Sequence, residues 1–94
     1  MMTIQHDEAG KKGIFFIKEN GEQLAELAYL RPVSGAMTIY HTEVSPKLRG
    51  EGIGQDMVAA VVKFARENSL KIKATCPYAK ELIDKTPEYQ DILA

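Results

Sequence analysis

The residues best suited to chemistry lie in a glycine-rich stretch near the middle of the chain. Arg49 is followed by Gly50, Gly52 and Gly54, and an amphipathic segment begins there. Glycine turns tightly and lets a backbone N–H approach a ligand closely. The first turn of a helix favours an anion, and Arg49 would add a positive charge. The stretch therefore predicts an anion-binding loop, with a turn of helix-capping glycines as the alternative.

The spacing of these glycines argues against two common phosphate-binding motifs. It does not match the Gly-x-x-x-x-Gly-Lys-Ser/Thr pattern of P-loop proteins. It also lacks the full dinucleotide-binding pattern, and the strand before it belongs to an antiparallel meander. Neither a P-loop NTPase nor a dinucleotide-binding domain is expected.

Strands are predicted in the first half of the chain and once more near its end. β-Branched and aromatic residues favour strands at 14–18, 23–30, 37–44 and 70–75. Asn20-Gly21, between the first two, is typical of a tight hairpin turn. Residues 1–12 are polar and are expected to form a mobile lead-in with some strand near residues 3–5.

Helices are predicted after the glycines and after the last strand. An apolar stripe at helical spacing begins at Ile53 and ends before Asn68. Pro77 opens a second helix over residues 78–85, and a last helical turn is expected at 88–93. The first helix joins two parallel strands by a right-handed crossover. The predicted fold class is α+β: a mixed sheet with an antiparallel N-terminal meander and a βαβ unit.

Length and composition limit the kind of protein. The 94 residues suit a single domain, 1–94. The 12 basic and 13 acidic residues give a net charge of -1, which argues against a nucleic-acid surface. The apolar runs are too short to span a membrane, and no signal peptide is visible. One cysteine and two separated histidines predict no disulfide and no metal site, and fit a reducing, cytoplasmic location.

The segment 41–54 resembles the acyl-CoA-binding signature of the Gcn5-related N-acetyltransferases (GNAT). That signature is Arg/Gln-x-x-Gly-x-Gly/Ala after a strand ending in a Val-x-Pro stretch, and Arg49, Gly52 and Gly54 match it. The Cys-Pro-Tyr sequence at 76–78 resembles the small, single-domain Yjdj-like branch of the superfamily. The resemblance covers most of the chain and implies the GNAT-like acyl-CoA N-acyltransferase fold.

The resemblance also implies where acetyl-CoA, or coenzyme A, would bind. In the family, loop amides hold the pyrophosphate, the preceding strand end holds the pantetheine arm, and the two parallel strands splay around the thiol end. The implied cofactor-binding residues are Val44, Leu48, Arg49, Gly50, Glu51, Gly52, Ile53, Gly54, Gln55, Tyr78 and Lys80.

Cys76, His41 and Glu43 are the candidates for catalysis. Acetyl transfer needs a neutral amine, a stabilised oxyanion and a proton for the leaving thiolate. Cys76 precedes a helix N-terminus, which lowers a thiol pKa, so it could carry the acetyl group or donate a proton. The alternative is a buried small hydrophobe.

His41 suits a proton acceptor because its ordinary pKa is roughly 6.5. Glu43 shares the strand face of His41 and could act as a base. The alternatives are a plain strand histidine and a solvated carboxylate. Because His41 and Cys76 come from adjacent strands, they are predicted to form a pair.

The predicted function is acetyl-CoA-dependent N-acetyl transfer to an amine, which could be a small amine, a lysine side chain or a protein N-terminus. Typical family members are longer and have two helices between their first strands that help build the acceptor site, which a hairpin replaces here. The acceptor site is therefore expected to be open, shared with a second subunit or degenerate, and the chain to be a monomer or weak homodimer. The alternatives are a non-catalytic acyl-CoA-binding module and an interaction domain that binds inorganic anions.

Overall fold

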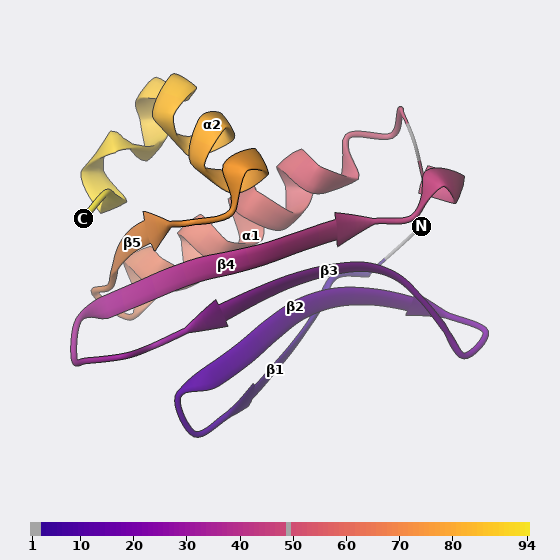
Figure 1. Ribbon diagram of the computed structural model, residues 1–94, viewed down its shortest axis with the longest axis horizontal. Coiled ribbons are helices and arrows are strands. Elements are labelled where there is room, and N and C mark those ends of the chain that lie inside the picture. Colours follow the sequence, from indigo (N-terminus) through magenta and orange to yellow (C-terminus); the bar gives the residue numbers. More distant parts are fainter. Residues whose placement is uncertain (1–2, 49) are drawn as a thin grey trace.

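A five-stranded sheet forms one layer of the fold and two helices form the other (Figure 1). The computed structural model describes residues 3–48 and 50–94. The strands are β1 (Gln5–Ala9), β2 (Lys12–Glu19), β3 (Glu22–Leu30), β4 (Ala36–Val44) and β5 (Lys71–Ala74). The helices are α1 (Ile53–Glu67) and α2 (Pro77–Lys85), and two 3₁₀ segments, η1 (Pro46–Leu48) and η2 (Pro87–Ile92), complete the order.

The strands lie in the sheet in their chain order. β1 to β4 form an antiparallel meander, and β5 pairs with β4 in parallel through the α1 crossover. Asn20 and Gly21 have φ angles of 51° and 80°, as the predicted hairpin turn requires. The mixed sheet with its meander and βαβ unit is therefore confirmed.

The expectation for the N-terminus was wrong, because residues 5–9 form a fourth strand of the meander. All five residues of β1 are exposed, so this segment lacks the alternation of apolar and polar residues that predicts a half-buried strand. The strand is held from its inner face. The His6 ring stacks on Phe15 with ring centres 4.1 Å apart, and its Nε2 lies 2.5 Å from the Tyr29 hydroxyl. The Tyr29 hydroxyl donates to Glu8 at 2.8 Å.

The pairing of β4 changes along its length. Ala28 pairs with His41 but Tyr29 pairs with Ile39, so Tyr40 is an extra residue, a bulge on β4. β5 pairs only with the first part of β4, from Ala36 to Ile39. Past that point β4 runs on to Val44 beside β3, and its other edge faces the helices.

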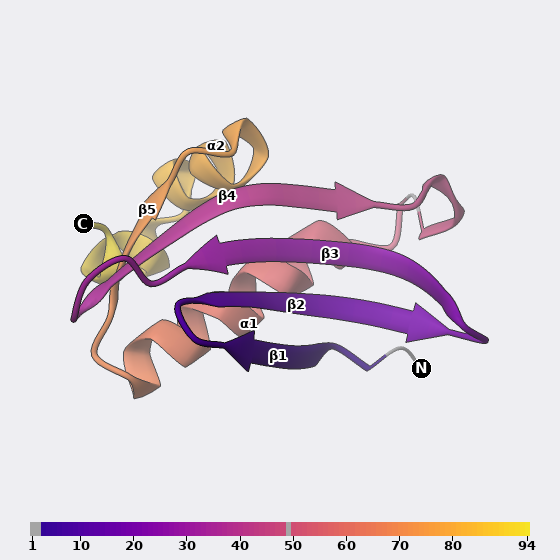
Figure 2. The same cartoon turned by 60° about the horizontal axis from the view of Figure 1, so that its bottom comes forward.

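The core lies between the sheet and the helices. Met37 and Ile39 of β4, Met57 of α1 and Ile83 of α2 are fully buried there. Both helices lie on one side of the sheet, as Figure 2 shows from a second direction, and the opposite side is bare of helix in the described residues. The same residues contain no helix with the length and apolar character needed to cross a membrane.

Candidate functional site at the start of the first helix

A groove of about 370 Å³ lies where the end of β4 meets the first turns of α1 and α2. Its walls come from three parts of the chain that are far apart in sequence. The lining residues are Thr42, Val44, Leu48, Gly50, Gly52, Ile53, Gly54, Gln55 and Tyr78. The groove therefore gathers most of the residues predicted to bind the cofactor. Arg49 lies outside the described residues.

The floor of the groove is the N-terminus of α1. Gly52 is the N-cap with φ 69° and ψ 20°, and Gly50 has φ 84°, a region that side chains rarely adopt. Within the described residues, no side chain caps this helix end. The first intrahelical bond there is from the Asp56 N–H to the Gly52 carbonyl, at 3.0 Å. The Glu51 N–H donates to the Leu48 carbonyl at 3.3 Å, whereas the N–H groups of residues 53–55 have no backbone partner among the described residues and are available to an anion in the groove.

One wall of the groove is the edge of β4 beyond Ile39, where no strand in the described part of the chain pairs with it. Thr75 and Cys76 both donate their backbone N–H to the Ile39 carbonyl, at 2.9 and 3.3 Å. The chain turns away from β4 at this point and enters α2. Thr42 and Val44 beyond it line the groove. The strands therefore separate where the resemblance predicts a splay.

The opposite wall is Tyr78 in the first turn of α2. Its side chain is 45% exposed, and a Cβ at Gly54 would overlap its ring. Burial raises the pKa of the Tyr78 hydroxyl, so this group stays protonated at neutral pH. Tyr78 thus offers the groove an aromatic surface and a hydroxyl donor.

Cys76 lies behind this wall as the N-cap of α2, with Pro77 at the first helical position. Its Sγ is 3.5 Å from the Thr42 hydroxyl. Burial raises the pKa of the thiol, but hydrogen bonds from Thr42 and from the backbone N–H groups of Ala79 and Tyr78 outweigh that effect. The net pKa is lowered, which increases the thiolate fraction at neutral pH.

The predicted Cys76–His41 pair is not formed, because the two side chains lie on opposite sides of the sheet. Thr42 contacts Cys76, so its strand neighbours His41 and Glu43 point the other way. The His41 Nε2 is 4.0 Å from a carboxylate oxygen of Glu43 and equally far from one of Glu26 on β3. The bulge at Tyr40 reverses the alternation of side chains after Ile39, so His41 and Glu43 point away from Cys76.

Lys80, also predicted to bind the cofactor, lies outside the groove. Its Nζ pairs with Asp84 one turn further along α2, at 2.7 Å, and it borders other hollows rather than the groove. Residues two positions apart point to nearly opposite sides of a helix, so Tyr78 and Lys80 cannot line the same wall. Glu51 is exposed between two of the lining glycines.

Thr42 is the residue of the groove that the sequence reasoning missed. It lines the groove and contacts the only cysteine of the chain. Period-2 alternation back from Val44 would have found it, because residues i and i−2 of a strand share a face.

The parallel splayed strands and the helix N-terminus at the groove define an acyl-CoA N-acyltransferase fold of the GNAT type. The family model described as GCN5-related N-acetyl-transferase matches residues 14–92. The chain therefore belongs to the GCN5-related N-acetyl-transferase family, and is an acyltransferase by fold and family. Enzymes of this family generally use acetyl-CoA.

Individual relatives agree with this assignment. Protein NATD1 of Xenopus tropicalis is 31% identical over 87 residues, which cover 92% of this chain and 78% of the relative. The solution structure of a GCN5-like protein from Staphylococcus aureus is 37% identical, with a TM-score of 0.76 over 96% of this chain and 87% of its own.

More distant structures share the fold alone. The ribosomal-protein-alanine N-acetyltransferase of Brucella melitensis has a TM-score of 0.61 at 21% identity, over 89% of this chain and 64% of its own. The narrower Yjdj-like assignment and the extent of a single domain over residues 1–94 stay predictions.

Proposed function

We propose that this chain binds acetyl-CoA in the groove and transfers the acetyl group to an amine. The observation that carries the proposal is the helix N-terminus at Gly52, which directs free N–H groups into a groove that continues along β4 to Thr42. The glycines leave room for a pyrophosphate close to the backbone. The edge of β4 beyond Ile39 offers backbone groups to an amide-containing arm such as pantetheine.

The residues present suit the coenzyme at each end of the groove. The pyrophosphate would meet the backbone from Gly50 to Gln55, and the thioester would lie toward Thr42 and Cys76. Tyr78 would cover the coenzyme from the side of α2. The cytoplasmic location remains part of the proposal, because a free thiol persists in a reducing compartment.

Cys76 is the proposed reactive group. Its thiolate attacks the carbonyl carbon of the thioester, and the C–S bond to coenzyme A breaks with departure of the coenzyme thiolate. The acceptor amine would then attack the acetyl-cysteine, break its C–S bond and regenerate the Cys76 thiolate. The proton lost from the amine nitrogen would pass through solvent to the coenzyme thiolate, so the products are the acetamide and coenzyme A thiol. The lowered pKa of Cys76 supports this route over simple proton donation to the leaving thiolate.

His41 and Glu43 belong to the proposal only on the acceptor side of the sheet. They lie on the face opposite Cys76, so neither acts on the thiol directly. A role as base for an incoming ammonium group would place the amine on that face, beside the splay.

Two measurements test the function. Calorimetry with acetyl-CoA should show binding, and absence of binding at millimolar coenzyme would refute the groove assignment. Release of coenzyme A thiol over a panel of amines and peptides tests turnover. Cys76→Ala should abolish turnover while the affinity for acetyl-CoA changes little, and unchanged turnover would remove Cys76 from the reaction.

Mass spectrometry distinguishes the two possible roles of Cys76, as a nucleophile that carries the acetyl group or as a proton donor to the leaving thiolate. The protein incubated with acetyl-CoA and no acceptor should gain the mass of one acetyl group, located on the peptide that holds Cys76. Turnover without this adduct would favour proton donation.

A second candidate is a non-catalytic acyl-CoA-binding module. The observation in its favour is the separation of Cys76 from His41 and Glu43, which leaves the thiol without the predicted base. Tight acetyl-CoA binding with no thiol release above background for any amine would support this candidate.

A further inference from the structure

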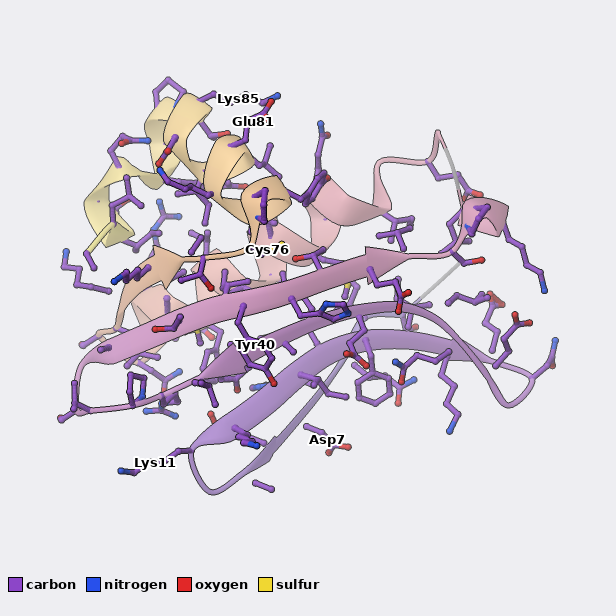
Figure 3. The ribbon with its side chains drawn as sticks, in the orientation of Figure 1. Asp7, Lys11, Tyr40, Cys76, Glu81 and Lys85 are labelled. Atoms are coloured by element: carbon purple, nitrogen blue, oxygen red, sulfur yellow. The ribbon has the colours of Figure 1, made fainter. Side chains whose placement is uncertain are left out.

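We call the side of the sheet opposite the helices the open face. The pairing register aligns its outward residues in rows across the strands. One row runs Ala9, Lys12, Leu30, Thr38, Lys73. The next outward row runs Asp7, Ile14, Ala28, His41, and the third runs Gln5, Phe16, Glu26, Glu43. Figure 3 shows Tyr40 and Asp7 on this uncovered side.

The centre of this open face is apolar. Ile14 and Phe16 of β2 are only partly buried, and the bulge residue Tyr40 is 45% exposed. Ala28 lies between them on β3 and is buried. A hollow of about 470 Å³ lies between Tyr40 and the β1–β2 hairpin, with Ile14 and Asp7 among its walls. Such a patch with a polar rim is typical of an interaction surface.

The charges of the open face are separated along the strand direction. Lys12 and Lys73 lie in the first row, whereas the Lys71 ammonium donates to the Asp91 carbonyl of η2. Glu26 and Glu43 lie together in the third row. Lys18 also faces outward on β2, two residues beyond Phe16. One end of the face therefore carries Lys12 and Lys73, and the other carries Glu26 and Glu43 with Lys18 beyond them. The apolar side chains lie between these two rows.

We propose that this face binds a second copy of the same chain about a two-fold axis. An axis in the plane of the interface and perpendicular to the strands reverses the strand direction of one copy. It places the Lys12–Lys73 row of each copy over the Glu26–Glu43 row of the other, with each lysine one strand to the side of a carboxylate, and joins the two apolar centres. Glu43 is covered in this dimer, so the dimer and an amine bound at Glu43 exclude one another. Each attractive pairing is then made twice, as a two-fold interface requires.

The charge pattern favours a second copy over other occupants. A basic peptide or an acidic polymer would be attracted by one end of the face and repelled by the other, whereas a reversed copy is complementary at both ends. Strand spacing of ~4.8 Å and a rise of ~3.4 Å per residue give the face roughly 600 Å². Specific dimers bury ~800 Å² per partner, so the dimer is expected to be weak.

Sedimentation equilibrium of the full chain tests the proposal without acetyl-CoA, so the result is independent of the proposed reaction. The wild type should dimerise with a Kd at or below the order of 1 mM. The variants Glu26→Lys/Glu43→Lys and Lys12→Glu/Lys73→Glu each place like charges opposite one another. Each should dimerise at least about tenfold more weakly.

Mixing the two variants gives the sharpest outcome. An equimolar mixture should form a heterodimer at least as stable as the wild-type dimer, because each cationic row then meets an acidic one. Matched controls carry the same charge changes on the helices: Glu67→Lys/Glu81→Lys and Lys63→Glu/Lys85→Glu should dimerise like the wild type. Figure 3 shows Glu81 and Lys85 on α2, away from the open face.

Circular dichroism and urea unfolding would establish that each variant is folded. A wild type that stays monomeric at millimolar concentration overturns the proposal. So does equal dimerisation of the wild type and the two open-face variants, which would place the interface elsewhere. Failure of the folded variants to form a heterodimer would refute the reversed two-fold arrangement.

Discussion

The ring of Tyr78 occupies the space that a side chain at position 54 would need, so the first turns of α1 and α2 are fitted to each other across the groove. Gly54 lies in α1 and has no positive φ, so its backbone conformation does not require glycine. Glycine is needed here because a side chain would overlap the ring of Tyr78. The shape of the proposed acetyl-CoA site thus depends on a glycine and an aromatic residue from separate elements.

Gly54→Ala should displace Tyr78 and weaken acetyl-CoA binding by about threefold to tenfold, roughly 1 kcal/mol. Stability should change little, because alanine is favoured over glycine by ~1 kcal/mol within a helix and the half-exposed tyrosine can move. Calorimetry on Gly54→Ala, Tyr78→Ala and the double variant measures the coupling. The added methyl group should cost less once the ring is gone, and additive effects would contradict the argument.

Gly13→Ala should have a much larger effect on stability than Gly54→Ala. A Cβ at Gly13 would overlap the ring of Tyr29, which is fully buried and hydrogen-bonded to Glu8. This ring cannot move into solvent, so overpacking should cost about 1–3 kcal/mol. Urea unfolding of the two variants against the wild type measures the difference. Equal stability of Gly13→Ala and wild type would mean that Tyr29 can be repacked.

The cluster that holds β1 should make stability depend on pH. Burial lowers the pKa of His6 below its ordinary value of 6.5. Burial raises the pKa of Glu8, but hydrogen bonds from Tyr29 and Arg31 outweigh this and bring the net pKa below the ordinary 4.5. Both groups therefore bind protons more readily in the unfolded chain, and acid favours unfolding.

The His6 contribution is fully present above pH 6.5 and is lost as the pH falls through the lowered pKa of His6. The Glu8 contribution is present above pH 4.5 and is lost in the same way at lower pH. Urea unfolding between about pH 7 and pH 3 follows both steps. His6→Phe, which keeps the ring stack, should flatten the upper step, and Glu8→Gln should flatten the lower one. An unchanged pH profile in either variant would contradict the assignment of that step.

Thr42→Val should raise the pKa of the Cys76 thiol. The Thr42 hydroxyl is one of the groups that lower this pKa, and valine has a similar shape without a donor. The ultraviolet absorbance of the thiolate, followed against pH, measures the shift, with Cys76→Ala as the blank. Thr42→Ser keeps a hydroxyl and should titrate closer to the wild type. If Cys76 is the proposed nucleophile, Thr42→Val should also slow acetyl transfer at neutral pH.

Local patterns in the sequence were sufficient to predict most of the elements. The Asn20-Gly21 turn, the apolar stripe from Ile53 and the proline at position 77 each act through contacts within a few residues, and the structure has the corresponding hairpin and helices. The glycines from 50 to 54 likewise predicted the position of the groove, because tight turns and helix N-termini are local features.

The strand β1 could not be predicted in the same way. Its residues are exposed and charged, and its place in the sheet depends on His6 meeting Phe15 and Tyr29. Tyr29 is more than twenty residues away from His6 along the chain. A contact over that separation leaves no periodic signal in the segment itself.

Local sequence was enough for the order of elements from β2 onward, the family signature and the glycine-built helix start. The tertiary structure alone decided which side chains face one another across the sheet. A one-residue bulge at Tyr40 directs Thr42 toward Cys76 and turns His41 to the open face. Side chains alternate with a period of two along a strand, so one extra residue reverses every side chain beyond it. The pairing of β3 with β4 sets that bulge, and the pairing is a property of the folded sheet.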